Sequence, residues 1–168
     1  MINIENKRIF IFGETHSNID EIHEYFDLIK VIKPDFYLHE LAIEDKCLSN
    51  RVLRERLRNC DKENLCDSRF NKFIYEFALE NDLKLIGIDL DMSFDRMSLK
   101  QQFQLREEHM LRTIRYYDNM GYKICVQLGD THIRSIKTTI LGPISPIYEF
   151  YRDREDCLII RSKTKEID

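Results

Sequence analysis

Several classes of protein are excluded by what this chain of 168 residues lacks. No apolar run approaches the roughly 20 residues that cross a bilayer, and residues 1–7 lack the apolar stretch and the cleavage pattern of a signal peptide. A basic face, which nucleic acid or an anionic membrane requires, is also missing, because the net charge is −4 with both signs interspersed. We therefore expect a cytoplasmic protein that binds neither nucleic acid nor membranes.

Glycine and cysteine are both sparse. The five glycines are dispersed, so there is no glycine-rich nucleotide loop, and no Gly-x-Ser-x-Gly motif indicates a serine hydrolase. The five cysteines include no CxxC pair and, in a cytosolic protein, are expected to be reduced. Cys125 and Cys157 lie in apolar runs, where they suit small buried hydrophobes. Cys60 and Cys66 could in principle bind a metal, although their spacing is wrong for a zinc knuckle.

Strand and helix signals alternate along the chain, whose length suits a single domain over residues 1–168. Short apolar runs predict buried strands over residues 8–12, 36–41, 84–88, 123–128 and 157–161, the last of them at a sheet edge. Apolar residues at helical spacing predict helices from a cap at Ser17 or Asn18 to Pro34, around 50–58, from a cap at Asp67 through Ala78, and from about Leu99 to Met120. This alternation predicts an α/β fold with a mostly parallel central sheet flanked by helices.

Two segments fall outside this alternation. Residues 42–66 are polar and contain four arginines, which are best interpreted as a solvated face. We expect this segment to cover the end of the sheet rather than to form a separate domain. Residues 147–151 follow a turn rich in proline and glycine, and we expect them to be extended.

One four-residue pattern, Gly-acid-Thr-His, occurs twice and follows an apolar run each time. Its copies are residues 13–16 (Gly-Glu-Thr-His) and residues 129–132 (Gly-Asp-Thr-His). A glycine at a strand end permits a positive φ or a close backbone approach, so that the histidine three residues later can point back over the sheet. A single histidine after a strand is usually an ordinary polar residue, but two in the same frame favour a function. We interpret the copies as two halves of one site.

Further polar residues follow the other predicted strands. In open α/β sheets, ligands bind beyond the carboxyl ends of the strands, so groups at those ends share one edge. From the first strand to the fourth, this edge is expected to carry Glu14 and His16, His39 and Glu40, Asp89 and Asp91, and Asp130 and His132.

The predicted helix over residues 99–120 has a charged residue on its apolar side. That side comprises Leu99, Phe103, Met110, Ile114 and Tyr117. Arg106 lies among them and His109 lies beside them. A charged side chain that faces a core requires a partner or a ligand, and Glu14, Glu40 and Asp130 are the expected partners. The alternative is an arginine whose stem packs while its head reaches water.

Histidines and carboxylates at one edge suit two chemistries, and the residues leave both open. They can hold a divalent metal that acidifies water or polarises a carbonyl group. They can also act without a metal, with a histidine or glutamate as general base and an arginine as the partner of the oxyanion.

The order of these motifs resembles one superfamily, which includes the TraB/PrgY proteins, the Tiki metalloproteases, the erythromycin esterases and the ChaN-like haem-binding lipoproteins. The matching pieces are residues 13–16, 39–40, 106–110 and 129–132, which span most of the chain in the family's order. The position after Arg106, often Asn in that superfamily, is Glu107 here.

The resemblance implies an α/β fold whose site is formed by Glu14, His16, Glu40, Arg106 and His132. In Tiki-like members, paired Gly-x-x-His motifs and a glutamate serve metal-dependent peptide cleavage. In the esterase members a histidine and acidic residues activate water, and ChaN-like members bind haem. For this chain the candidate metal ligands are His16, Glu40 and His132, and the candidate ions are Mn, Co and Zn. Further candidate site residues are His39, Asp89, His109 and Asp130.

Our leading hypothesis is a hydrolase of an ester or a peptide-like amide bond in a small molecule or peptide, with or without a divalent metal. Glu14, His16, Glu40 and His132 would hold the metal or activate water, and Arg106 would orient a carboxylate or stabilise the oxyanion. A binding protein for haem or another small anionic ligand is the first alternative. A fold that has lost its chemistry and acts through protein contacts, with residues 42–66 as the contact segment, is the second. The oligomeric state is left open.

Overall fold

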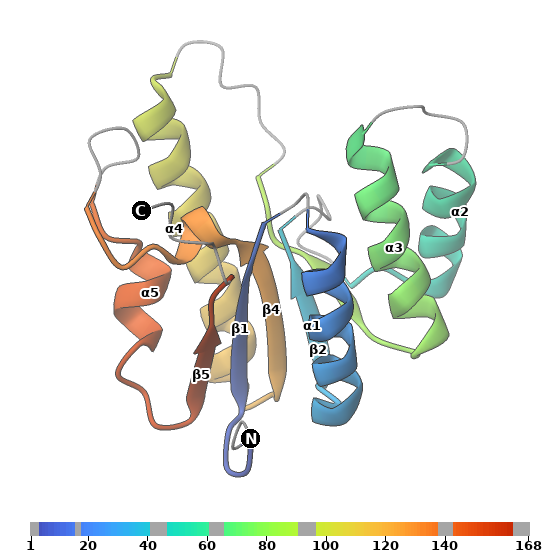
Figure 1. The fold of residues 1–168 in the computed structure, drawn as a ribbon, viewed down its shortest axis with the longest axis horizontal. Coiled ribbons are helices and arrows are strands. Elements are labelled where there is room, and N and C mark those ends of the chain that lie inside the picture. The colour runs from blue at the N-terminus through green and yellow to red at the C-terminus, as the bar shows by residue number, and fades with distance from the viewer. Residues whose placement is uncertain are drawn as a thin grey trace.

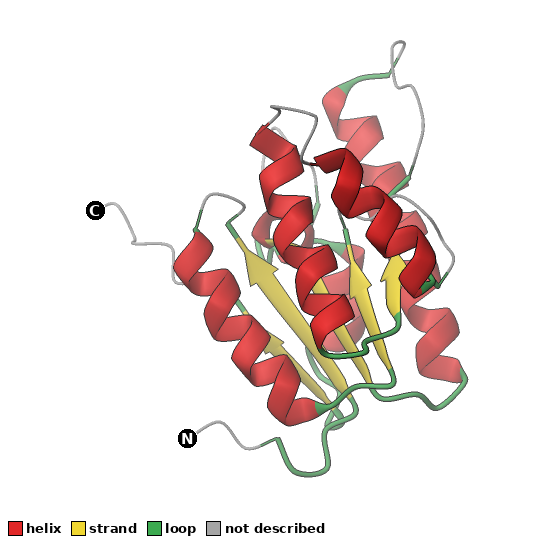
Figure 2. Ribbon diagram, turned by 90° about the vertical axis from the view of Figure 1, so that its right-hand side faces the viewer, coloured by secondary structure: helices red, strands yellow, loops and turns green. Residues whose placement is uncertain are grey.

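Parallel pairing joins all five strands that the described residues form (Figure 2). The computed structural model describes residues 4–15, 18–40, 47–60, 66–90, 97–137 and 143–162, with residues 60 and 66–70 described by their backbone alone. In chain order the strands are β1 (Ile9–Glu14), β2 (Phe36–His39), β3 (Leu85–Gly87), β4 (Ile124–Gly129) and β5 (Cys157–Ile160). Their order across the sheet is β3-β2-β4-β1-β5, which places β5 at an edge as predicted.

Helices cover both faces of this sheet (Figure 1). The described helices are α1 (Ile19–Ile32), α2 (Asn50–Cys60), α3 (Cys66–Glu80), α4 (Leu99–Asn119), the short 3-10 helix η1 (Asp130–Ile133) and α5 (Pro146–Tyr151). Side chains of α1, α2 and α3 pack with Phe10, Phe12 and Tyr37 on one face of the sheet. Side chains of α4 and α5 pack with Ile11 and Val126 on the other. The predicted α/β fold, with a mostly parallel sheet between helices, is therefore confirmed.

Most helix ends follow the local signals in the sequence. The Asn18 side chain accepts the amide of Glu21 at the start of α1, as the predicted cap requires. Ser98 and Gln101 form a reciprocal capping box at the start of α4. Gly121 has a φ of 81° just beyond the end of α4, a conformation that favours glycine and explains why the helix stops there.

Three local predictions were wrong. Residues 146–151 form α5 instead of extended chain, because Ser145 caps the helix and Pro146 suits its first turn. Helix α3 begins at Cys66, so Asp67 lies inside it and is not its cap. Leu99 is 63% exposed and does not join the apolar side of α4, because it occupies the first turn, beyond the core.

Part of the polar segment 42–66 lies against the sheet. The Leu48 amide donates to the Leu85 carbonyl at 2.8 Å, and Cys47 forms an isolated bridge with Ile86. Leu53 of α2 is fully buried in the core next to α3. Residues 41–46 and 61–65 lie outside the described residues. No helix in the described ranges is long and apolar enough to cross a membrane.

Candidate active site

Alternation along the strands divides the polar residues at the carboxyl edge between the two faces of the sheet. Along β1, Phe12 packs on the α1 side, so Glu14, two residues later, leaves the sheet on that side. His39 follows Tyr37 onto the same face for the same reason. Glu40 continues the opposite alternation from Leu38, which packs on the α4 side. The predicted edge residues therefore form two groups, one on each face.

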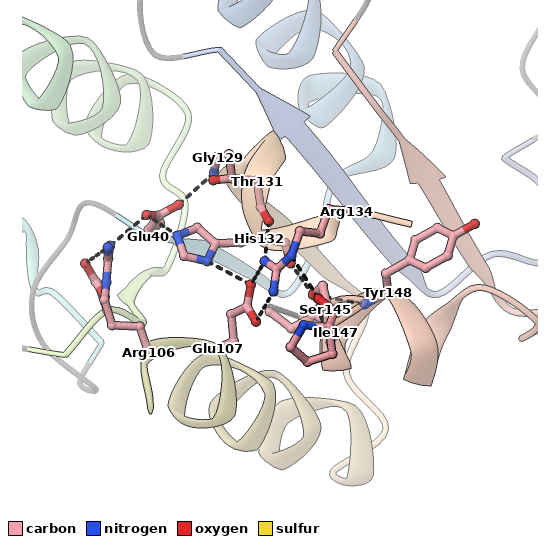
Figure 3. A network of polar contacts seen from close by, with 12 residues as sticks. Glu40, Arg106, Glu107, Gly129, Thr131, His132, Arg134, Ser145, Ile147 and Tyr148 are labelled. Atoms are coloured by element: carbon pink, nitrogen blue, oxygen red, sulfur yellow. Dashed lines mark hydrogen bonds and ion pairs between the residues drawn. The ribbon is translucent and has the colours of Figure 1, made fainter. Parts of the chain in front are cut away.

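His132 lies at the centre of the group on the α4 side (Figure 3). Its Nε2 atom is 3.1 Å from Oε1 of Glu40, and its Nδ1 atom is 3.5 Å from Oε1 of Glu107, an ion-pair contact that lacks hydrogen-bond geometry. The Phe103 ring stacks on the imidazole with 5.0 Å between centroids. His132 is 2% exposed, so both carboxylates act on it with little solvent between them. The imidazole is thus held between two acids and an aromatic ring.

This arrangement favours the charged form of His132. Burial alone would lower the pKa of the imidazole, but the contacts with Glu107 and Glu40 outweigh it and raise the pKa to about 9. Burial would likewise raise the pKa of Glu40, but its contacts with His132, the Gly129 amide and Arg106 lower it to about 2. At neutral pH the pair is therefore an imidazolium and a carboxylate.

Glu40 is joined to the solvent-facing edge by an arginine. Oε2 of Glu40 accepts the Gly129 amide at 2.7 Å, and Oε1 accepts Nη2 of Arg106 at 2.9 Å. Arg106 also donates Nε and Nη2 to the two oxygens of Asp89, at 2.8 and 2.6 Å. The side chain of Arg106 is 24% exposed and that of Asp89 is 14% exposed, against 3% for Glu40. Arg106 and Asp89 thus form the accessible side of the group.

Glu107 and Arg134 close the inner side of the group. The guanidinium of Arg134 contacts both carboxylate oxygens of Glu107, one of them at 3.1 Å. Arg134 also donates Nη1 to the Thr131 carbonyl at 2.8 Å and Nε to the Pro143 carbonyl at 3.0 Å. Oγ of Ser145 donates to the His132 carbonyl, which ties η1 to the start of α5. Backbone contacts therefore fix the segment that carries His132.

We call these six residues the imidazole network. Its members are Glu40, Asp89, Arg106, Glu107, His132 and Arg134. Three carboxylates face two guanidinium groups and one imidazole, so their formal charges cancel only when the imidazole is protonated. Neutralising a buried cluster in this way limits its desolvation penalty, which is the physical reason for the high pKa of His132.

The group on the α1 side is a buried hydrogen-bonded chain. The Tyr37 hydroxyl donates to Oε1 of Gln127 at 2.5 Å, and the amide nitrogen of Gln127 donates to Glu14. Nε2 of His39 lies 4.0 Å from Oε1 of Glu14. All four residues are at most 2% exposed. Burial and the Glu14 charge raise the pKa of Tyr37, so it remains a hydroxyl donor.

Two predicted site residues lie elsewhere, and a third is outside the described residues. His16 lies outside the described residues, so its half of the doubled motif stays a prediction. Asp130 is the first residue of η1, and its carboxylate accepts Nε of Arg161 at 3.0 Å. His109 is 7% exposed, with Nδ1 2.9 Å from Arg112 of the same helix. Asp130 thus pairs with Arg161, and His109 contacts Arg112.

The glycine of the first motif has a steric role. A Cβ atom on Gly13 would lie 2.4 Å from Cδ1 of Ile133 and 2.6 Å from Oδ1 of Asp130. Gly13 therefore allows η1 to approach β1 closely, as one of the two predicted explanations requires. Of the described glycines, a positive φ occurs at Gly121, and Gly129 has an ordinary φ of −56°. The second explanation, a positive φ at the strand end, was wrong for Gly129.

Sequence reasoning missed part of the machinery. Gln127 was counted only as part of an apolar run, although a polar residue in a strand buried on both faces is itself a signal. Glu107 was noticed only as a departure from a family pattern. Arg134 and Ser145 carried no signal, because their partners are distant in the sequence.

A metal would have to replace a proton of His132. Among the described residues, no three His, Cys, Asp or Glu side chains are arranged to hold a metal ion. Nε2 of His132 and Oε1 of Glu40 are close enough to bind one cation together if the imidazole were neutral. Metal binding at this pair would therefore release a proton and weaken as the pH falls.

Comparison with known proteins shows a shared fold. No protein-family model matches the chain. No curated protein matches it either. The structure of the type III effector HopBA1 has a TM-score of 0.52 and 16% identity, over 90% of this chain and 75% of that one. A structure described as "Bacterial protein toxins" has a TM-score of 0.55 and 14% identity, over 92% of this chain and 34% of that one. The chain thus spans about a third of the toxin. Identities this low relate the folds alone.

Proposed function

We propose that the protein is a hydrolase of an ester or a peptide-like amide bond and that His132 transfers the proton of the reaction. One observation carries this proposal. His132 is a buried imidazole held between two carboxylates, beside an arginine that reaches the surface. A histidine that only filled space in the core would need neither two acids nor a pKa near 9. The resemblance to the superfamily that contains esterases and metalloproteases supports the same chemistry.

The arrangement assigns a task to each side of the network. Arg106 and Asp89, the accessible pair, would receive the substrate carbonyl, with the guanidinium stabilising the oxyanion that forms. His132 would then give its proton to the leaving alkoxide or amine. A proton from the attacking water would restore the imidazolium, so that ester plus water gives acid plus alcohol. Glu40 would stabilise the imidazolium form of His132 each time the ring is reprotonated.

Two other functions are less well supported. Haem or another small anionic ligand would meet a network with no net positive charge and an imidazole whose nitrogens both face carboxylates. A role through protein contacts is favoured by one observation, a hollow of about 600 Å³ along α2 whose lining is Asn50, Arg51, Arg54, Glu55 and Arg58. That role would leave the buried imidazole network unexplained.

A hydrolysis assay with paired histidine variants tests the proposal. Short-chain p-nitrophenyl esters and peptide anilides would be offered to the wild type, to His132→Asn and to His23→Ala, an exposed histidine of α1. We expect His132→Asn to lose about a hundredfold or more in kcat/KM, the usual contribution of an acid–base group, and His23→Ala to lose nothing. Circular dichroism would establish that both variants are folded. Equal activity in all three proteins would refute the proposal.

Two added measurements separate the alternatives. Elemental analysis of the purified protein, with activity measured after EDTA and after return of Mn²⁺, Co²⁺ or Zn²⁺, asks whether a metal takes part. Activity that EDTA abolishes and one of these ions restores would replace the metal-free mechanism with a metal-assisted one. A Soret shift with haemin that His132→Asn removes would instead favour the haem-binding alternative. No hydrolysis together with no Soret shift would leave the protein-contact role.

A further inference from the structure

We propose that Glu107 and Arg134 form a clamp that fixes the orientation of the His132 ring, so that Nε2 faces Glu40 and the accessible edge. This inference rests on the proposed role of His132 and adds two positioning residues to it. Neither residue is expected to touch the substrate, because Glu107 and Arg134 lie on the Nδ1 side of the His132 ring, away from Arg106 and the accessible edge.

The first argument is the position of the clamp behind the imidazole. Glu107 lies on the Nδ1 side of the ring and Glu40 on the Nε2 side (Figure 3). A carboxylate 3.5 Å from Nδ1 attracts the charged imidazolium, and so favours the ring orientation in which Nε2 faces the reaction. Phe103, stacked on the ring, blocks rotation out of this plane. Glu107 is thus placed to act on His132 from the side away from Arg106.

The second argument is that Arg134 prevents Glu107 from moving. A buried carboxylate at 3.5 Å from a single N–H could turn toward the ring or away from it. Arg134 contacts both of its oxygens, and such fork-to-fork pairing fixes the plane of the carboxylate. Two backbone carbonyls, those of Thr131 and Pro143, hold the guanidinium in turn. The clamp is therefore anchored independently of His132.

The third argument is the way the clamp joins two elements. Glu107 comes from α4, next to Arg106, whereas Arg134 follows His132 by two residues and belongs to the same turn of chain. The pair therefore holds η1 against α4 at the distance that places His132 beside Glu40. A purely structural salt bridge could lie anywhere on this interface, but this one shares a carboxylate with the imidazole.

Charge-matched variants test the clamp. Glu107→Gln keeps the shape but removes the negative charge beside Nδ1–H, and Arg134→Gln frees the carboxylate. The double variant removes both charges, so it restores charge balance and is expected to recover stability lost by either single variant. If the clamp positions His132, the double variant stays as slow as Glu107→Gln. We expect kcat to fall about ten- to a hundredfold, as when a carboxylate that orients a histidine is removed, with KM within about twofold.

A measurement on the ring itself separates the clamp from the proposed hydrolysis. In protein labelled with ¹⁵N-histidine, His132→Asn identifies the ring N–H signals of His132. We expect the Nδ1–H signal to move upfield or to be lost by exchange in Glu107→Gln and in the double variant. Asp118→Asn, which changes a buried acid at the far end of α4, is the control and should leave this signal in place.

An unchanged Nδ1–H signal in Glu107→Gln, or full kcat in the double variant, would overturn the clamp even if His132 proves essential. No hydrolysis by the wild type, with the spectral change present, would overturn the function and leave the clamp.

Discussion

The two ends of α4 each place a buried acid in a network of charges, and the two networks differ in kind. At the carboxyl edge of the sheet, the imidazole network surrounds His132. At the amino edge, Asp118 accepts Arg8 at 2.7 Å, Tyr151 at 3.3 Å and the guanidinium of Arg154. We call this second group the Asp118 network, and its members are Arg8, Asp118, Tyr151, Arg154 and Asp156.

Both networks are neutral, but only one depends on a titrating group for its neutrality. In the Asp118 network two arginines balance two aspartates, the pKa of Asp156 is lowered by Arg154, and that of Tyr151 is raised by burial. Its charges are therefore constant from mildly acidic to mildly alkaline pH. The imidazole network reaches neutrality through a proton on His132. A buried cluster built only for stability needs no such proton, which is why we assign chemistry to one end of α4 and structure to the other.

Removing the central acid of the Asp118 network should give the largest loss of stability. Asp118→Ala leaves the buried Tyr151 hydroxyl without this acceptor and leaves two part-exposed arginines with Asp156 as a partner, which costs about 3 kcal/mol. Urea unfolding would measure this loss. Asp153→Ala, which removes an exposed ion pair with Arg152, is the control and should change stability by less than about 1 kcal/mol. A small loss in Asp118→Ala would show that the amino edge is not held by this network.

The pH dependence of stability should come from the carboxyl edge. The folded pKa of His132, about 9, lies above its ordinary value of 6.5. Its contribution is therefore complete below about pH 6.5 and is lost as the pH rises through about 9, on the order of 3 kcal/mol. Unfolding free energies from pH 6 to 8, below the range in which burial of the Cys125 and Cys157 thiols also makes stability fall with pH, should decrease in the wild type and stay nearly level in His132→Asn. If His132→Asn shows the same slope as the wild type, a residue other than His132 causes the pH dependence of stability.

The same comparison shows what the sequence could predict. Apolar runs predicted all five strands. A strand buried on both faces, such as β1 or β4, contains little else, and the part-exposed edge strand β5 is also apolar. The meeting of Glu40 and His132 followed from parallel topology, which brings carboxyl ends to one edge, and that of Arg106 followed from its place on the apolar side of α4. The sequence could not predict that Glu14 and Glu40 leave the sheet on opposite faces. The face depends on the residue at which each strand ends, because side chains alternate between faces along a strand.

Residues outside the periodic segments were the least predictable. The two Gly-acid-Thr-His copies look equivalent in sequence, yet Glu14 belongs to β1 and pairs with Gly129, whereas Asp130 already belongs to η1. Their registers differ by one residue, so the acids point in different directions. Arg134 became visible only through its contacts, since nothing in its neighbourhood distinguishes it from a surface arginine. Sequence patterns thus located the site at the carboxyl edge of the sheet, while tertiary contacts determined which side chains pair there.

Alanine substitutions at two glycines, one near each edge of the sheet, test the difference between the edges. Gly13→Ala would force η1 away from β1 and should cost about 1–3 kcal/mol, as overpacking does. Because η1 carries His132, kcat/KM should fall as well. Gly121→Ala, at the other end of the molecule, meets no neighbouring atom but must adopt a positive φ, which costs about 1–2 kcal/mol. Thermal unfolding and ester hydrolysis would separate the two effects. Equal loss of activity in both variants would contradict the assignment of chemistry to the carboxyl edge.

The smallest effect should follow removal of the cap at the start of α4, the helix that carries Arg106 and Glu107. Ser98→Ala breaks the capping box of α4 and should cost about 1 kcal/mol. Fraying of a helix is confined to its first turn, and Arg106 lies beyond that turn, held by Asp89 and Glu40. At a temperature well below unfolding, kcat should therefore change less than about twofold, because the lost capping energy raises the activation free energy little if the imidazole network keeps its geometry. A larger fall in kcat would mean that the network depends on the start of α4 and not on its own contacts.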